Sequence, residues 1–113
     1  DHMPDKDIVQ NYVTELKRGN LVLAVLGSLD TPHYGYALLQ TLQERGMEIE
    51  ANTLYPLLRR LEKQELLESD WDTTKSRPRK YYTISKKGQM VKDKLFEAWK
   101  EMQKSLMDIY SGE

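Results

Sequence analysis

The sequence predicts a mainly α-helical protein with one small β-hairpin, and three observations support this fold class. Apolar residues recur at helical spacing through most of the chain, whereas residues 67–84 contain two short stretches typical of strands. Basic residues concentrate around these same strands. The length of 113 residues corresponds to one domain with a modest core.

Positive charge is separated from negative charge along the chain, although the net charge is only −1. Residues 1–52 carry a net charge of −4, and residues 88–113 carry −1. Residues 53–87 contain nine basic and five acidic residues. A local excess of positive charge matters more for an anionic partner than the total does, so this region is the candidate for nucleic-acid binding.

The composition excludes several classes of protein. The chain has no cysteine, which excludes disulfide bonds and thiolate chemistry and fits a cytoplasmic location. No apolar run approaches the roughly 20 residues that span a bilayer, and no signal peptide is recognised. We therefore expect a cytoplasmic protein without a membrane partner, in which residues 1–3 are a cloning remnant and Met3 is the natural start.

Two helices are predicted in the first part of the chain. An amphipathic helix covers residues 5–18, with an apolar stripe of Ile8, Val9, Tyr12, Val13 and Leu16. The segment from Leu21 to Leu29 is almost entirely apolar, and its pattern fits either a buried helix or a buried strand. Its Leu and Ala residues favour a helix, which we expect to bend away from the first near Gly19.

The next two helices are separated by a short connector. Pro32 is tolerated at a first helical position, so a helix is predicted from there to Arg45, and Gly46 is placed to end it in the left-handed conformation. Its apolar face consists of Tyr36, Leu38, Leu39 and Leu42. Residues 47–50 form the connector, which is typical of a helix-turn-helix but equally of a plain interhelical turn.

The helix after this connector organises the rest of the chain. Thr53 is a good N-cap, which would place Pro56 in the first turn. The apolar stripe consists of Leu54, Leu57, Leu58 and Leu61. The opposite side carries Asn52, Pro56, Arg59 and Lys63, with Tyr55 and Arg60 at its edges, and contains no acid. This side could meet a phosphate backbone without repulsion, although an ordinary amphipathic surface helix shows the same pattern.

Two strands are predicted after this helix, over residues 67–71 and 80–84, and a polar loop over residues 72–78 joins them. The basic residues of this hairpin are Lys75, Arg77, Arg79 and Lys80. A hairpin that merely covers the core is the alternative. The combination of basic helix and basic hairpin favours a winged helix-turn-helix over residues 19–85.

The last helix is predicted over residues 86–110, with Ser85 as its cap. Its apolar residues are Val91, Leu95, Trp99, Met102, Leu106 and Ile109, which from Leu95 onward form a coiled-coil seam. At about 1.5 Å per residue the helix is longer than a small domain needs to cover itself. We therefore expect this helix, together with the N-terminal helix, to form a homodimer interface.

An enzyme is not expected. His33 is the only histidine outside the segment assigned as a cloning remnant, and the sequence shows no glycine-rich phosphate loop and no metal-ligand spacing. We expect no catalytic residue, no metal and no cofactor.

Several motifs resemble the PadR family of bacterial transcriptional regulators. The resemblance extends from about Gly19 to Ile109 and is carried by Tyr34–Leu38 (YGYAL), Thr53–Glu62 (TLYPLLRRLE), Arg79–Tyr82 (RKYY) and Ser85–Gly88 (SKKG). Two residues depart from the family pattern. Glu65 stands where a glycine is usual, and Ser85 stands where a threonine is more common.

The resemblance implies a homodimeric repressor that binds an inverted repeat in promoter DNA and responds to small molecules. Phe96–Trp99 (FEAW) is similar to the multidrug-responsive lactococcal regulator. In that subgroup the corresponding tryptophan lines a flat cavity between subunits and stacks on planar drugs.

Double-stranded DNA is therefore the expected partner. The candidate DNA-binding residues are Tyr34, Tyr36, Asn52, Thr53, Tyr55, Pro56, Arg59, Lys63, Arg77, Arg79 and Lys80. Tyr36 is expected to serve core packing more than DNA contact. The alternative function is a winged helix for protein–protein contact, whose outer helix face would be apolar or acidic.

A small planar hydrophobic ligand is the second expected partner. Two flat indole rings brought together at a twofold axis near Trp99 could stack such a molecule. The candidate effector-binding residues are Trp99, Leu95, Met102, Val9, Tyr12 and Val13. Plain packing of Trp99 in the seam is an equal alternative.

Overall fold

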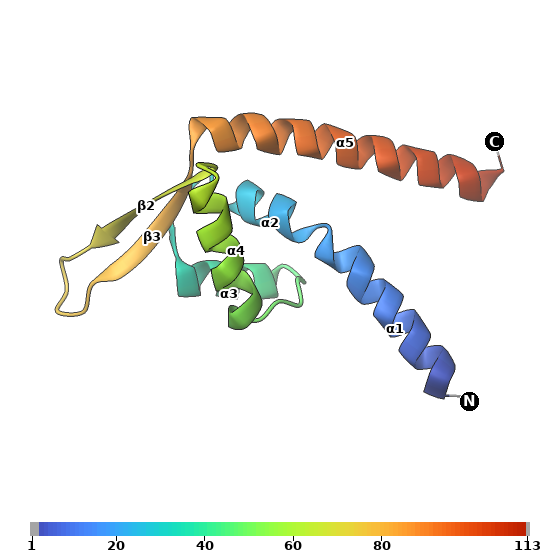
Figure 1. The fold of residues 1–113 in the computed structure, drawn as a ribbon, viewed down its shortest axis with the longest axis horizontal. Coiled ribbons are helices and arrows are strands. Elements are labelled where there is room, and N and C mark those ends of the chain that lie inside the picture. Colours follow the sequence, from blue (N-terminus) through green and yellow to red (C-terminus); the bar gives the residue numbers. More distant parts are fainter. Residues whose placement is uncertain (1–2, 113) are drawn as a thin grey trace.

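The computed structural model describes residues 3–112 and places two long helices beside a small winged body (Figure 1). The elements in chain order are α1 (Met3–Arg18), α2 (Leu21–Ser28), β1 (His33–Tyr34), α3 (Gly35–Glu44), α4 (Ala51–Lys63), β2 (Leu67–Asp72), β3 (Arg79–Ile84) and α5 (Lys86–Ser111). Helices α1 and α5 extend away from the body on one side, and the β2–β3 hairpin extends on the other (Figure 1). We call this hairpin, with residues 73–78, the wing.

The core lies where α2, α3 and α4 meet the sheet. The three strands are antiparallel in the order β1-β3-β2. Leu67 of β2 pairs with Ile84 of β3, and both side chains are buried. The four leucines predicted for the stripe of α4 are all buried in this core. The mainly α fold with a winged helix-turn-helix is therefore confirmed.

Several local predictions are also confirmed. The apolar segment after Gly19 forms helix α2, which is separated from α1 by a short turn. Gly46 adopts a φ of +95°, the left-handed conformation expected after α3. The Ser85 hydroxyl accepts a hydrogen bond from the backbone N–H of Gly88 at 2.9 Å and caps α5. The prediction of a cloning remnant at residues 1–3 falls largely outside the described residues.

The predicted start of α4 is wrong. The helix begins at Ala51 after Glu50, because the Glu50 carbonyl accepts hydrogen bonds from Thr53 and Leu54 at 3.0 Å each. Thr53 is therefore not the cap and lies in the first turn. Pro56 lies inside the helix, where its missing N–H leaves the carbonyl of Asn52 without an intrahelical partner. Asn52 and Pro56 are both exposed, so water can reach the Asn52 carbonyl.

The predicted start of α3 at Pro32 is also wrong. His33 and Tyr34 form strand β1, which pairs with Tyr82 and Tyr81 of β3, and α3 begins at Gly35. Tyr36, expected in the core, is 52% exposed because it lies just after this strand on the outer surface. A strand of two residues is too short to produce a visible alternation in the sequence.

The junction between α4, β2 and α5 is tightly fixed. The Leu66 carbonyl accepts a hydrogen bond from the N–H of Ser85 at 3.0 Å, and the Ser85 hydroxyl donates to the Glu65 carbonyl at 2.7 Å. Gly88 lies so close that an added Cβ would overlap the Leu66 carbonyl oxygen and the Ile84 side chain. The start of α5 is thus held against the end of α4.

Glu65 supplies a test of this junction. Its φ of +67° is left-handed, which costs a non-glycine residue about 1–2 kcal/mol. The change Glu65→Gly relieves this strain, while the extra entropy of glycine in the unfolded chain offsets about 0.5–1 kcal/mol. We expect Glu65→Gly to raise the free energy of unfolding by about 0.5–1 kcal/mol in urea titrations.

The control for this prediction is Glu65→Ala, which removes the carboxylate but keeps the Cβ. This control also loses the exposed ion pair with Lys87 at 3.9 Å, a contact of little energetic value. If Glu65→Ala stabilises the protein as much as Glu65→Gly does, the strain at this residue is not the cause.

Candidate nucleic-acid interface

The outer face of α4, formed by Asn52, Pro56, Arg59 and Lys63, is exposed along the helix. It is held outward because the leucines on the opposite side are buried in the core. Thr53 is exposed as well, and Tyr55 is half-buried at the edge. The ring of Tyr55 lies against Gly35, where a Cβ would come within 2.6 Å of its Cε1 atom.

The positive charges on this face are not neutralised by the protein. In the described part of the chain, no salt bridge involves Arg59, Arg60 or Lys63. The one acid within α4, Glu62, turns toward the wing and accepts hydrogen bonds from Ser69 and Lys80. The hydrogen bond from Ser69, followed by Lys80, lowers the pKa of Glu62. This carboxylate is thereby held in its charged form against the wing.

The basic residues of the wing are held in two different ways. Arg77, with Lys75, lies in the exposed segment between the strands, as predicted. Lys80 is half-buried, its ammonium group lies 3.3 Å from Glu62, and it sits 5.4 Å from the centre of the Tyr82 ring. Arg77 is therefore free to meet a partner, whereas the charge of Lys80 is already partly compensated.

Arg79, in the strand pair next to the loop of the wing, belongs to a cluster that joins β3 to β1 and to the start of α3. Its guanidinium lies 4.5 Å from the centre of the Tyr34 ring and donates a hydrogen bond to the Tyr36 hydroxyl at 2.8 Å. The rings of Tyr34 and Tyr36 are parallel, with centres 5.8 Å apart. The Tyr34 hydroxyl donates to the Asp72 carboxylate. We call these four residues the tyrosine–arginine cluster.

Asp72 is the acidic member of this cluster and is strongly perturbed. The hydrogen bond from Tyr34, followed by two from the hydroxyl and N–H of Thr74, lowers its pKa from 3.8 to about 2. The same bond to Asp72 raises the pKa of the Tyr34 phenol. Asp72 did not emerge from the sequence, because a lone acid at the end of an alternating strand carries no distinguishing pattern.

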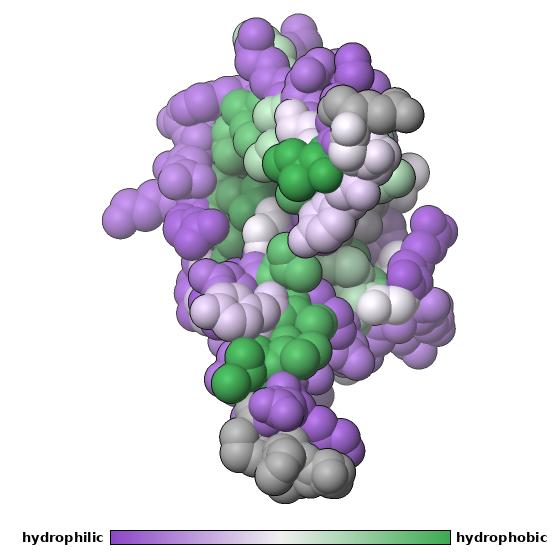
Figure 2. Space-filling model, turned by 90° about the vertical axis from the view of Figure 1, so that its right-hand side faces the viewer, coloured by the Kyte–Doolittle hydropathy of each residue, from purple (hydrophilic) through white to green (hydrophobic). Residues whose placement is uncertain are grey.

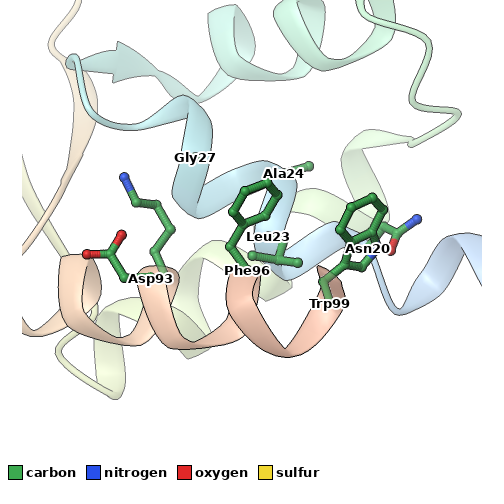
Figure 3. A pocket seen from close by; sticks show the side chains of 8 residues that line it. Asn20, Leu23, Ala24, Gly27, Asp93, Phe96 and Trp99 are labelled. Atoms are coloured by element: carbon green, nitrogen blue, oxygen red, sulfur yellow. The ribbon is translucent and has the colours of Figure 1, made fainter. Parts of the chain in front are cut away.

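A second candidate site lies between α2 and α5, where two cavities meet at Trp99. One has a volume of about 490 Å³ and is lined by α2 and by Lys92, Phe96 and Trp99 of α5. The rings of Phe96 and Trp99 are stacked, with centres 5.8 Å apart, and project toward α2 (Figure 3). The other cavity, of about 690 Å³, is lined by Leu95, Trp99 and Met102 among others. Both volumes fall in the range of small-molecule sites, about 300–1,000 Å³.

The structure brings together only part of the predicted effector site. Leu95, Trp99 and Met102 share a cavity, but Val9, Tyr12 and Val13 line neither of the two. The α2 residue Leu23 lines both cavities instead. The missed residue Phe96 had a signal in the sequence, since it lies three residues before Trp99 on the same helix.

Apolar side chains remain exposed on both long helices, and they gather on the face shown in Figure 2. On α1 they are Ile8, Val9, Tyr12 and Leu16, each more than half exposed, whereas Val13 is half-buried. On α5 they include Leu95, Met102, Leu106 and Ile109 of the predicted seam. Val91 and Trp99, also assigned to the seam, are half-buried, and Val91 packs against the core of the same chain.

Two further features bear on the class of protein. Among residues 3–112, no group of His, Asp and Glu side chains is arranged to hold a metal ion. No helix in that range is long and apolar enough to cross a membrane.

The fold and the exposed basic helix define a winged helix protein of the kind found in transcriptional regulators, and comparison with known proteins identifies the family. Residues 22–94 match the model of the transcriptional regulator PadR-like family. The chain belongs to this family.

Solved structures of the family agree. A PadR family transcriptional regulator from Eggerthella lenta is 45% identical, with a TM-score of 0.94 over 99% of this chain and 100% of that one. A PadR-like regulator from Bacillus cereus is 26% identical, with a TM-score of 0.78 over 88% and 99%. A Lysinibacillus sphaericus protein named uncharacterized protein X is 31% identical over 86% of this chain and 93% of its own.

The tyrosine–arginine cluster allows a test through the pKa of Asp72. Because the pKa of Asp72 in the folded protein lies below the ordinary 3.8, its contribution to stability is present above about pH 3.8 and is lost as the pH falls through about 2. The change Tyr34→Phe removes the largest cause, so we expect the pKa of Asp72 to rise toward 3.8 in an NMR titration of its carboxyl carbon. An unchanged midpoint in Tyr34→Phe would show that Tyr34 does not hold the carboxylate.

Proposed function

We propose that this PadR-like regulator is a repressor that binds an inverted-repeat promoter site as a homodimer. The observation that carries the proposal is the outer face of α4, which is exposed, basic and free of acids. An apolar or acidic outer face would instead favour protein–protein contact. The hairpin beside this helix supplies the wing that such readers of DNA place on the flanking backbone.

The residues of α4 divide into two roles. Arg59 presents the forked donors that pair with O6 and N7 of guanine, and Asn52 presents the amide that pairs with adenine. Thr53 and Tyr55 lie nearer the start of the helix, where side chains and N–H groups bind phosphates and fix the register. Lys63 extends these contacts to the backbone at the other end of the helix.

The apolar residues left exposed on α1 and α5 support the proposed homodimer. They repeat at heptad spacing on α5, which favours a helix–helix contact with a second copy. A twofold axis through this contact would present two copies of α4 to half-sites about one helical turn apart.

The effector site of the proposal lies beside the dimer contact. The stacked pair of Phe96 and Trp99 opens on a cavity that is mainly apolar and wide enough for a planar aromatic molecule. Trp99 also lines the cavity that reaches the seam residues Leu95 and Met102. A ligand that binds one spacing of the helices better than another would alter the half-site geometry and release the DNA.

The DNA-reading role of α4 is tested with Arg59→Ala. We expect wild type to bind a labelled duplex from upstream of its own gene more tightly than a scrambled duplex, with a strong salt dependence. Loss of Arg59 should cost about 1–3 kcal/mol of discrimination and so reduce this preference by about 5- to 150-fold in gel-shift titrations.

The matched control is Lys94→Ala, which removes one exposed positive charge from α5, away from α4. It should leave the preference unchanged. If wild type and Arg59→Ala bind the native and scrambled duplexes equally, the outer face of α4 is not a reader of DNA, and a protein partner becomes the better hypothesis.

The effector site is tested by fluorescence. The chain has two tryptophans, Trp71 and Trp99, so Trp71→Phe leaves Trp99 as the single reporter. We expect a planar hydrophobic dye to quench the Trp99 emission with a saturable dependence on dye concentration. Phe96→Ala should weaken binding of the dye at least several-fold, because half of the stack is lost. Quenching that does not saturate, or that persists unchanged in Phe96→Ala, would contradict a specific site.

A further inference from the structure

A small hollow lies beside the first residues of β3, between that strand, β1, α3 and α4. Its volume is about 190 Å³, and its lining includes Tyr34, Tyr36, Tyr55, Arg79 and Lys80. These residues come from four elements, β1, α3, α4 and β3, which the sheet pairing and the core bring together. At about 30 Å³ per water molecule, the hollow holds one phosphate group with a little water.

The hollow offers more donors than acceptors. Arg79 has five N–H donors, of which one is used by the Tyr36 hydroxyl, and that hydroxyl keeps its own proton available. Within the described residues, the Tyr55 hydroxyl has no hydrogen-bond partner. The acid nearest to Lys80 is Glu62, which lies outside the lining and offsets the charge of Lys80 only. A group that only accepts hydrogen bonds and carries negative charge complements such a site.

Asp72 builds this hollow without lining it. Its carboxylate accepts a hydrogen bond from the Tyr34 hydroxyl, and the hydroxyl and N–H of Thr74 donate two more, at 2.7 Å and 3.0 Å. Tyr34 is thereby held with its ring under the guanidinium of Arg79. The position of Arg79 over the hollow thus depends on a residue of opposite charge in β2.

We propose that the hollow binds one phosphate of the DNA backbone, and that Asp72 strengthens DNA binding by holding Tyr34 under Arg79. Asp72 is then a positioning residue, and Arg79, Tyr36 and Tyr55 are the phosphate ligands. The inference rests on the proposed function, because the phosphate is that of bound DNA. The inference adds to the proposed function a phosphate subsite in which an acid, Asp72, strengthens the binding of DNA through the position of Arg79.

The sign of the effect separates this proposal from ordinary electrostatics. Removing an acid near a DNA-binding surface normally strengthens binding, since it lowers repulsion. Here the removal of Asp72 should weaken binding. Asp70 is the matched control, because it is an exposed acid on the same strand, and within residues 3–112 its carboxylate accepts a hydrogen bond only from the N–H of Trp71 next to it.

The experiment measures the dissociation constant over a range of salt concentrations for wild type, Asp72→Ala, Asp70→Ala and Tyr34→Phe. Both the upstream duplex and a scrambled duplex are used, because phosphate contacts do not read sequence. For Asp72→Ala and Tyr34→Phe we expect about tenfold weaker binding to both duplexes. The slope of log K against log salt should fall by about 0.9, the value of one phosphate contact.

A double variant adds a readout that a merely structural role would not move. The pair Tyr34→Phe with Asp72→Ala should bind no worse than either single change, because both act through the same hydrogen bond. Thermal unfolding establishes that each variant is folded at the temperature of the assay. Asp70→Ala should bind as tightly as wild type or slightly tighter, with an unchanged salt slope.

The outcomes distinguish this inference from the proposed function. If Asp72→Ala binds as tightly as wild type or tighter, with the same salt slope, the phosphate subsite is overturned even when wild type prefers the upstream duplex. If wild type shows no such preference but the salt slope still falls in Asp72→Ala, the subsite stands and sequence-specific repression fails. Absence of binding to either duplex overturns both.

Discussion

The backbone junction at Leu66 is the constraint on which the rest of the structure depends. The Leu66 carbonyl accepts a hydrogen bond from the N–H of Ser85, and Gly88 lies so close to this carbonyl that no larger residue fits at position 88. The last turn of α4, the first residue of the wing and the first turn of α5 are therefore held as one unit. Any movement of α5 must be passed to α4 or must break this junction. The helix proposed to carry the subunit contact is thus connected rigidly to a helix that faces outward with free positive charge.

Internal hydrogen bonds also determine which charges of the molecule remain available at its surface. Acids near the wing are used internally, since Glu62 is held by Ser69 and Lys80, and Asp72 is held by Tyr34 and Thr74. Their hydrogen bonds keep both carboxylates ionised. Within residues 3–112, the cations of α4 and of the loop at the tip of the wing form no salt bridge. The small net charge therefore gives no measure of the local field that a DNA duplex would meet.

The sequence predicted the elements with long, regular patterns and failed where structure depends on contacts far apart in the chain. The leucine stripe of α4 and the Ser85 cap follow from local spacing, so both were found. Strand β1 was missed because two residues produce no alternation, and its pairing with β3 decides where α3 begins. For the same reason Tyr36 was misplaced in the core. The roles of Asp72 and Phe96 required knowledge of which side chains meet, although the spacing of Phe96 and Trp99 was visible.

The central claim is that α5 joins two copies of a DNA-reading helix, and sedimentation equilibrium tests it most directly. Wild type should sediment as a dimer of the 13.3 kDa chain, and two chains should bind one duplex that carries an inverted repeat. Leu106→Asp places a charge in the predicted seam and should give a monomer that binds DNA poorly, whereas Lys104→Asp on the opposite side of α5 should remain a dimer. A wild-type protein that sediments as a single chain, alone and on DNA, would contradict the account.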